Sequence, residues 1–430
     1  MSFIPVNLGP PMPPLTGNSA FSRVTALAAR RRVHAAFSWL HLNPKRIMDW
    51  QTELVKIPAP LNGEQARGEW IGRRFAEVGL SRIETDAVGN VFGVLEAADL
   101  TPESTGPVVV VSAHLDTVFP AGTQLEPVME GERLYAPGAC DNGAGVAGML
   151  AIAFALAEAK MPLPVPLVFV GNVGEEGEGD LRGMRYLYRE NPLAGRIAAH
   201  IVMDGAGVDS AVTQALGSRR FHLTVRGPGG HSFTDAGTPN PIAALAMALA
   251  TLAETPLPEE PRTTLSLGTV CGGTSVNSIP ESAEATVDFR STSVEQLTRL
   301  EVALHRAAED AVDHWNRKAK AAGTDGRGRL DFTIRKIGDR PAAKLAEDSA
   351  LLETLRAVDR HLGLQTELRL GSTDANLPLS LGVPSVSIGA GGDGGGAHTL
   401  AEWYSAKNRE LGLRRVLFLV LAMVDWASEQ

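Results

Sequence analysis

The sequence predicts an α/β protein of two domains: a larger domain built on a mostly parallel sheet flanked by helices, and a smaller α+β domain inserted into it. Three observations support this prediction. Apolar runs of strand length alternate with helical patterns in the outer parts of the chain. Between residues 216 and 338 the strands and helices follow a different order. The 430 residues also exceed the length that one hydrophobic core usually serves.

The first predicted elements are helices within residues 45–80, followed by a hairpin. Residues 67–78 place Trp70 and Phe75 among apolar residues at helical spacing. The segment 83–95 alternates between apolar and polar residues and contains Gly89-Asn90, a typical hairpin signal.

Four apolar runs then predict strands of the main sheet, and a stretch of small apolar residues at 143–159 predicts a helix packed on that sheet. The strand runs are residues 107–113, 165–172, 198–203 and 383–389. The apolar segment 416–426 is too short to cross a membrane and predicts a core helix.

The segment 216–338 predicts the split βαββαβ unit of ferredoxin-like domains. Its expected strands and helices are residues 221–226, 241–254, 263–270, 284–289, 294–319 and 330–337. The larger domain therefore comprises residues 1–215 and 339–430, with residues 1–40 as an N-terminal extension whose first 20 or so residues form a flexible or docked arm. The glycine-rich run 391–396 predicts a mobile loop.

Composition excludes several classes of function. A net charge of −9 argues against a nucleic-acid partner and gives no reason to expect binding to an anionic membrane. The two cysteines cannot build a disulfide framework or a thiolate metal site. No secretory signal or membrane-spanning run is recognisable, so we expect a cytoplasmic protein.

Acids and histidines follow each predicted strand of the larger domain. They are His114 and Asp116, Glu175 and Glu176, Asp204, and His398, with Asp141 just before the helix at residue 143. In an open parallel sheet the carboxyl ends of the strands line one crevice, where ligands bind. We therefore expect these side chains to converge, as in hydrolases that use two metal ions.

The pair His114 and Asp116 fits a metal ligand and its orienting carboxylate. Residues two apart on a strand share a face, and a ligating imidazole needs its second nitrogen held. The alternative is an exposed pair without a metal, since a histidine and an aspartate at this spacing most often lie on the surface. Its position at the end of a β run favours the ligand.

Asp141, the pair Glu175-Glu176 and His398 also have structural alternatives. Asp141 alone is more simply an N-cap. Glu175 and Glu176 fit a solvated acidic loop, and a lone histidine such as His398 is more often structural. Two acids beside a buried strand end would repel each other, however, unless cations neutralise them.

A charge count favours a centre with two divalent cations. Asp141, Glu176 and Asp204 supply three negative charges and a hydroxide would supply the fourth. The two histidines complete a nitrogen and oxygen shell that zinc, cobalt or manganese accepts. Glu175 is then left as a general base.

Several segments resemble the M20 family of metallopeptidases, nearer its peptidase T-like and dipeptidase branches. They span residues ~50 to 425 in family order and are jointly specific. The segments are His114-Leu-Asp-Thr-Val, Gly138-Ala-Cys-Asp-Asn-Gly, Gly174-Glu-Glu-Gly, Gly229-Gly-His-Ser, Ser372-Thr-Asp-Ala-Asn and His398-Thr-Leu-Ala-Glu-Trp.

The resemblance implies a zinc-peptidase-like catalytic domain with an inserted lid and dimerisation domain. It implies two divalent metals, most simply zinc. It assigns His114, Asp141 and Asp204 to one metal, and Asp141, Glu176 and His398 to the other. It also implies a non-proline cis peptide after Asp141, Glu175 as base and Asp116 as orienter.

In the inserted domain the resemblance implies that His231 reaches the reacting carbonyl across a homodimer interface, where it would stabilise the oxyanion. Asn277 and Arg290 match substrate-contacting positions, and Asp374 lies in a possible second substrate loop. Their alternatives are a turn residue for Asn277, a strand-edge salt bridge for Arg290 and an Asx-type turn for Asp374.

The sequence thus predicts hydrolysis of amide bonds in short peptides, by an aminopeptidase, dipeptidase or tripeptidase. Family members with those activities tend to have Asp at position 204, whereas acylases and carboxypeptidases tend to have Glu. Two alternatives stay open: an N-acyl or N-carbamoyl amino-acid amidohydrolase, and an inactive binding protein on the same fold.

Overall fold

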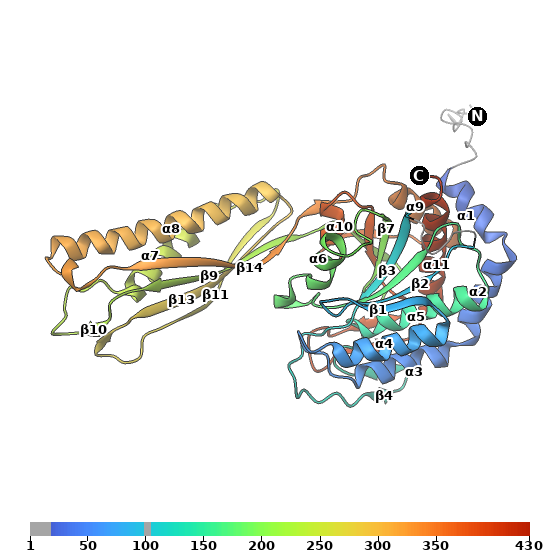
Figure 1. The fold of residues 1–430 in the computed structure, drawn as a ribbon, viewed down its shortest axis with the longest axis horizontal. Coiled ribbons are helices and arrows are strands. Elements are labelled where there is room, and N and C mark those ends of the chain that lie inside the picture. The colour runs from blue at the N-terminus through green and yellow to red at the C-terminus, as the bar shows by residue number, and fades with distance from the viewer. Residues whose placement is uncertain (1–18, 99–104) are drawn as a thin grey trace, which may run out of the picture.

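The computed structural model describes residues 19–98 and 105–430 and consists of two lobes (Figure 1). A rounded lobe contains the C-terminus and the first helices, and an elongated lobe projects from one side of it. Most of the N-terminal arm expected from the sequence lies outside the described residues. The rest of the predicted extension, from residue 19 to residue 40, is helical and packs on the rounded lobe.

The helices of the described residues include the predicted ones and several more, among them α1 and α2 in the N-terminal extension. They are α1 (Ala20–Ala28), α2 (Arg31–Leu42), α3 (Pro44–Val55), α4 (Gln65–Val78), α5 (Gly143–Glu158), α6 (Arg182–Arg189), α7 (Pro241–Ala253), α8 (Val294–Ala321), α9 (Ala350–Leu362), α10 (Asn376–Ser380) and α11 (Arg409–Ala427). None of these helices is long and apolar enough to cross a lipid bilayer.

The main sheet of the described residues has nine strands. They are β1 (Ser81–Thr85), β2 (Val91–Leu95), β3 (Val108–His114), β6 (Leu167–Asn172), β7 (Ile197–Met203), β8 (Ser210–Ala215), β15 (Ala343–Lys344), β16 (Glu367–Gly371) and β17 (Ser385–Ile388). Their order is β1-β2-β6-β3-β7-β17-β8-β15, with β16 also paired to β8. The central pairs β6–β3, β3–β7 and β7–β17 are parallel, which confirms the predicted fold class.

Alternation along β3 explains why helices cover both faces of this sheet. Val109 and Val111 belong to the core beneath α5 and α11, whereas Val108 and Val110 pack with residues of α6 and α10. A strand buried on both faces reads as a continuous apolar run, as this one does.

Helix α5 packs unusually close to the sheet because its residues are small. A Cβ atom at Gly145 would collide with the carbonyl oxygen of Met203 at the end of β7. This contact brings the loop before α5 next to the residue that follows β7, and so positions two of the predicted site residues.

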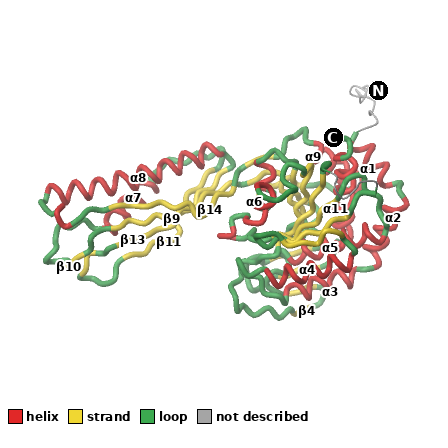
Figure 2. Tube along the Cα trace, in the orientation of Figure 1, coloured by secondary structure: helices red, strands yellow, loops and turns green. Residues whose placement is uncertain are grey.

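The elongated lobe has the predicted βαββαβ order. Its strands β9 (Gly217–Arg226), β11 (Thr263–Gly272), β13 (Ser282–Ser291) and β14 (Asp331–Arg340) form an antiparallel sheet in the order β11-β13-β9-β14. Apolar residues of α7 and α8 pack on this sheet as a separate core. The strands β9 and β14 also connect the two lobes (Figure 2).

Two smaller sheets complete the described residues. The strands β10 (Gly230–His231) and β12 (Ser278–Ile279) pair in the elongated lobe. In the rounded lobe β4 (Val128–Glu130), β5 (Arg133–Tyr135), β18 (Asp393–Gly395) and β19 (Trp403–Ser405) form a sheet in the order β18-β19-β5-β4.

The prediction of a mobile loop at residues 391–396 was wrong. Part of this run forms β18, which pairs with β19. A Cβ atom at Gly394 would collide with the Sγ atom of Cys140, and one at Gly392 would collide with Tyr404. The glycines therefore permit close packing of the backbone rather than motion.

Candidate metal and catalytic centre

The predicted acids and histidines gather where neighbouring parallel strands end. His114 is the last residue of β3, and Asp204 directly follows β7. Glu175 and Glu176 lie just beyond β6, on the other side of β3. Because the carboxyl ends of these strands share one edge of the sheet, residues far apart in the sequence become neighbours.

Asp141 and His398 reach the same place from loops. The N-cap of α5 is Asn142, whose side-chain oxygen accepts the backbone N–H of Gly145 at 3.0 Å. The carboxylate of Asp141 is therefore not used as the cap. The peptide bond between Asp141 and Asn142 is cis, as the resemblance implies.

Asp141 lies between the two histidines. Its Oδ1 atom is 3.0 Å from Nε2 of His114, and its Oδ2 atom is 3.0 Å from Nε2 of His398. The same nitrogen of His398 is 3.0 Å from Oε1 of Glu176. Nε2 of His114 is also 3.8 Å from Oδ1 of Asp204. One carboxylate thus faces two imidazole nitrogens through different oxygens.

This donor set fits divalent cations. His114, Asp141 and Glu176 each offer a ligand atom, and these atoms all lie within 4.8 Å of one another. Ligand atoms that share a zinc ion with bonds of about 2 Å are themselves roughly 3 Å apart. Burial raises the pKa of Glu176, and Asp141 raises it further, so added positive charge would stabilise the ionised acids.

His114 is held in the orientation that a metal ligand needs, although not in the way expected. Its Nδ1 atom lies 3.1 Å from the backbone carbonyl oxygen of Asp116, so Nδ1 carries the proton and Nε2 faces Asp141. The carboxylate of Asp116 is 3.8 Å from the ring. It instead accepts the backbone N–H groups of Glu175 at 3.0 Å and Glu176 at 2.7 Å.

Comparison with known proteins identifies the family to which the chain belongs. Residues 110–422 match the sequence model of peptidase family M20/M25/M40. The chain belongs to this family. M20 enzymes are metal-dependent peptidases, so the family is consistent with a metal at the cluster of His114, Asp141 and Glu176.

Relatives of this M20 chain include proteins with and without a known activity. The cytosol non-specific dipeptidase of Escherichia coli is 30% identical over 288 residues, covering 60% of this chain and 56% of that protein. The uncharacterized protein YqjE of Bacillus subtilis is 24% identical over 365 residues, covering 81% and 91%. The aminopeptidase PepT of Bacillus cereus, a solved structure, has the same fold with a TM-score of 0.68 and 21% identity, covering 89% of this chain and 99% of its own.

Asp374, predicted to contact substrate, is buried near the candidate metal centre and is not exposed to solvent. Its side chain is fully buried, and its Oδ2 atom accepts the side-chain N–H of Asn172 at 2.6 Å. Burial raises the pKa of this carboxyl to about 7. The structure therefore places no exposed atom of Asp374 where a substrate could contact it.

Arg340, the partner of Glu175, was not identified from the sequence. Nη1 of Arg340 is 2.9 Å from Oε1 of Glu175, and its Nη2 atom donates to the backbone oxygen of the same residue. Both residues are only 5% exposed. Burial raises the pKa of Glu175 well above its usual value, although the charge of Arg340 opposes this. Because Arg340 ends β14, the pair joins the proposed base to a strand that connects the lobes.

Glu402 is a second residue that the sequence analysis missed. Its buried carboxylate accepts the backbone N–H groups of Gly138, Cys140 and Asp141 at 2.7–2.8 Å. It therefore fixes the loop that carries Asp141. A signal was present, since Glu402 lies in the same family-like segment as His398.

Among the described residues, the three predicted residues of the elongated lobe make no hydrogen bond or ion pair with the proposed ligands or base of this chain's own centre. His231 is exposed on β10, near the tip of that lobe (Figure 1). Asn277 is exposed nearby, and its backbone oxygen accepts the N–H of Ser232. Arg290 is next to last in β13 and lies in register with Ser218 near the start of β9. Its side chain pairs with Asp288 at 2.7 Å.

Proposed function

We propose that this protein is a dinuclear metallopeptidase that hydrolyses amide bonds in short peptides. The placement of Asp141 between His114 and His398 is the observation that carries the proposal, because the two oxygens of one carboxylate could then serve two cations. When bound, the cations would polarise the scissile carbonyl and lower the pKa of a water molecule.

We assign the ligands as the resemblance implies. His114, Asp141 and Asp204 would hold one cation, and Asp141, Glu176 and His398 the other. The nitrogen and carboxylate donors suit zinc best, with cobalt or manganese as further candidates. The distances of 3.0 to 3.8 Å between these donor atoms support the assignment.

Glu175 is the proposed general base. Its carboxylate would accept a proton from the attacking water and deliver it to the nitrogen of the leaving amine. Three features support this role. Glu175 is buried, it is next to Glu176, and the carboxylate of Asp116 accepts the backbone N–H groups of both glutamates. Arg340 would hold the Glu175 side chain in place.

Peptides with a free amino group are the proposed substrates. The dipeptidase relative and the aspartate at position 204 support this choice. The test is hydrolysis of a panel of free dipeptides and tripeptides, set against N-acetyl and N-carbamoyl amino acids. We expect the free peptides to be cleaved. Cleavage of only the acylated compounds would instead establish the amidohydrolase alternative.

The proposed location is the cytoplasm, which the name of the Escherichia coli relative supports. We also propose that residues 216–338 form an inserted lid and dimerisation domain within a catalytic domain of residues 1–215 and 339–430. The exposed edge strand β11 supports a homodimer, since Leu267 is 39% and Val270 is 63% exposed there.

His231 is the proposed oxyanion donor, supplied by one subunit to the centre of the other. Its Nδ1 atom accepts the backbone N–H groups of Phe233 and Thr234, so the proton lies on Nε2, which can donate. Replacing His231 by alanine should lower kcat by roughly 10²–10³-fold. Steady-state kinetics of the variant would measure this loss.

Mixed dimers test whether His231 acts across the interface. His231→Ala chains co-expressed with Glu175→Gln chains would form one complete centre from the two defective subunits. Recovered activity supports the assignment. If the mixed protein is no more active than its parents, His231 does not act in the partner's centre.

A further inference from the structure

A pocket of about 840 Å³ opens beside the candidate metal centre. Three separate segments line it: the loop after β3, the strands β4 and β5, and the turn at residues 398–400. Its apolar lining includes Val118, Phe119, Pro120, Val128 and Leu400.

The pocket shares one wall with the centre. His398 lines the pocket, and Nε2 of the same imidazole lies 3.0 Å from both Asp141 and Glu176. Tyr135 and Ala136, also in the lining, immediately precede the loop that carries Asp141. The pocket is therefore adjacent to the proposed metal centre, and His398 belongs to both.

The lining indicates which group the pocket takes. Val118 is 39% exposed, Val128 is 51% exposed and Leu400 is 72% exposed. Covering exposed apolar side chains removes them from water, which favours binding of an apolar ligand group. The carboxylate in the lining is Glu126, which disfavours an acidic ligand group.

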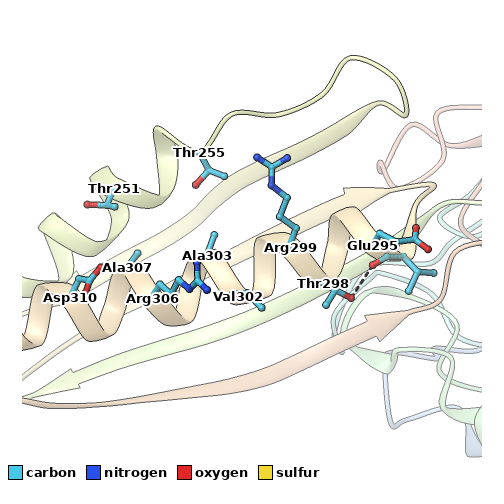
Figure 3. Close-up of a pocket in the computed structure, with 11 residues that line it drawn as sticks. Thr251, Thr255, Glu295, Thr298, Arg299, Val302, Ala303, Arg306, Ala307 and Asp310 are labelled. Carbon is cyan, nitrogen blue, oxygen red and sulfur yellow. Dashed lines mark hydrogen bonds between the residues drawn. The ribbon is translucent and has the colours of Figure 1, made fainter.

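A second pocket of comparable size gives no such indication. It runs along α8 and α7 in the elongated lobe and is lined by residues such as Thr251, Arg299 and Asp310 (Figure 3). None of the proposed ligands or the base lines it. The pocket beside His398 is therefore the better candidate for a substrate subsite.

We propose that the pocket beside His398 receives a large apolar side chain of the peptide residue next to the scissile bond. This inference rests on the proposed peptidase function and adds a preference to it. Peptides with Phe or Leu at that residue would be favoured over peptides with Ala, and those with Asp or Glu would be disfavoured.

Neighbouring residues of β4 provide a matched test. Val128 and Met129 are each 51% exposed, but only Val128 lines the pocket. The substrates are Phe-Ala, Ala-Phe, Glu-Ala and Ala-Ala, so that a preference at either residue is seen. Val128→Asp should lower kcat/KM for the preferred Phe peptide about tenfold or more relative to Ala-Ala. Met129→Asp should leave that ratio within about twofold of wild type.

Failure of this inference can be told apart from failure of the proposed function. If peptides are cleaved but the two variants show the same ratio as wild type, the pocket assignment is wrong and the peptidase function stands. If no peptide is cleaved, calorimetric binding of the two Phe peptides and Ala-Ala to the zinc-loaded protein decides. If a Phe peptide binds more tightly than Ala-Ala, and Val128→Asp abolishes this difference, the pocket assignment is supported. If the Phe peptides bind no more tightly than Ala-Ala, the assignment is wrong.

Discussion

Glu175→Gln is expected to lower kcat by roughly 10²–10⁴-fold, the contribution typical of a positioned general base. Glutamine keeps the size of the side chain and an oxygen that can accept from Arg340, but it cannot take a proton from water. Because Glu175 is not a proposed metal ligand, the variant should bind as much metal as wild type. Steady-state kinetics and metal analysis of the same preparation would measure both quantities.

Glu178→Gln is the matched control for this substitution. It makes the same chemical change three residues further along the loop, at an exposed position. We expect kcat to stay close to the wild-type value. Near-wild-type turnover in Glu175→Gln would reject the assignment of the base, and equal losses in both variants would point to a general effect of charge in the loop.

Arg340→Met should destabilise the folded protein by about 3–5 kcal/mol, the cost of leaving one partner of a buried ion pair unpaired. Methionine fills much of the volume but leaves the carboxylate of Glu175 buried without its cation. The backbone oxygen of Glu175 also loses a donor. Urea unfolding of the metal-free protein would measure the change in the free energy of unfolding.

An exposed ion pair provides the comparison. Arg369 pairs with Glu367 on the surface, where both side chains are more than half exposed. Arg369→Met should cost less than about 1 kcal/mol. The double variant Arg340→Met with Glu175→Gln should recover part of the loss, since it removes the buried charge as well. A cost for Arg340→Met no larger than for Arg369→Met would contradict the account of this pair.

The fold could largely be predicted because its strands carry strong local signals. The runs that became β3, β6, β7 and β17 are apolar along their length, as strands buried on both faces must be. The strands β8 and β16 were missed. They lie near the edge of the sheet and bury fewer residues, so their sequences carry less apolar pattern.

The candidate ligands were also recognisable, because each follows a strand or precedes a helix that the sequence predicts. The role of Arg340 and the hydrogen bonds of the Asp116 carboxylate could not be predicted in this way. Both depend on which groups meet only after folding, and Arg340 and Glu175 are 165 residues apart in the sequence. The glycine run at residues 391–396 was misread because glycine serves mobile loops and close packing alike, and only the neighbours Cys140 and Tyr404 distinguish them.

The most direct test of the metal centre is the metal content of the purified protein after equilibration with zinc and removal of unbound ions. Wild type should retain two equivalents per chain, as a two-metal centre requires. Asp141→Asn should retain far less, because Asp141 faces both histidines. Asp209→Asn, the same change at an exposed position, should match wild type. Wild-type protein that retains neither zinc, cobalt nor manganese, or Asp141→Asn that binds as much as wild type, would contradict the proposed centre.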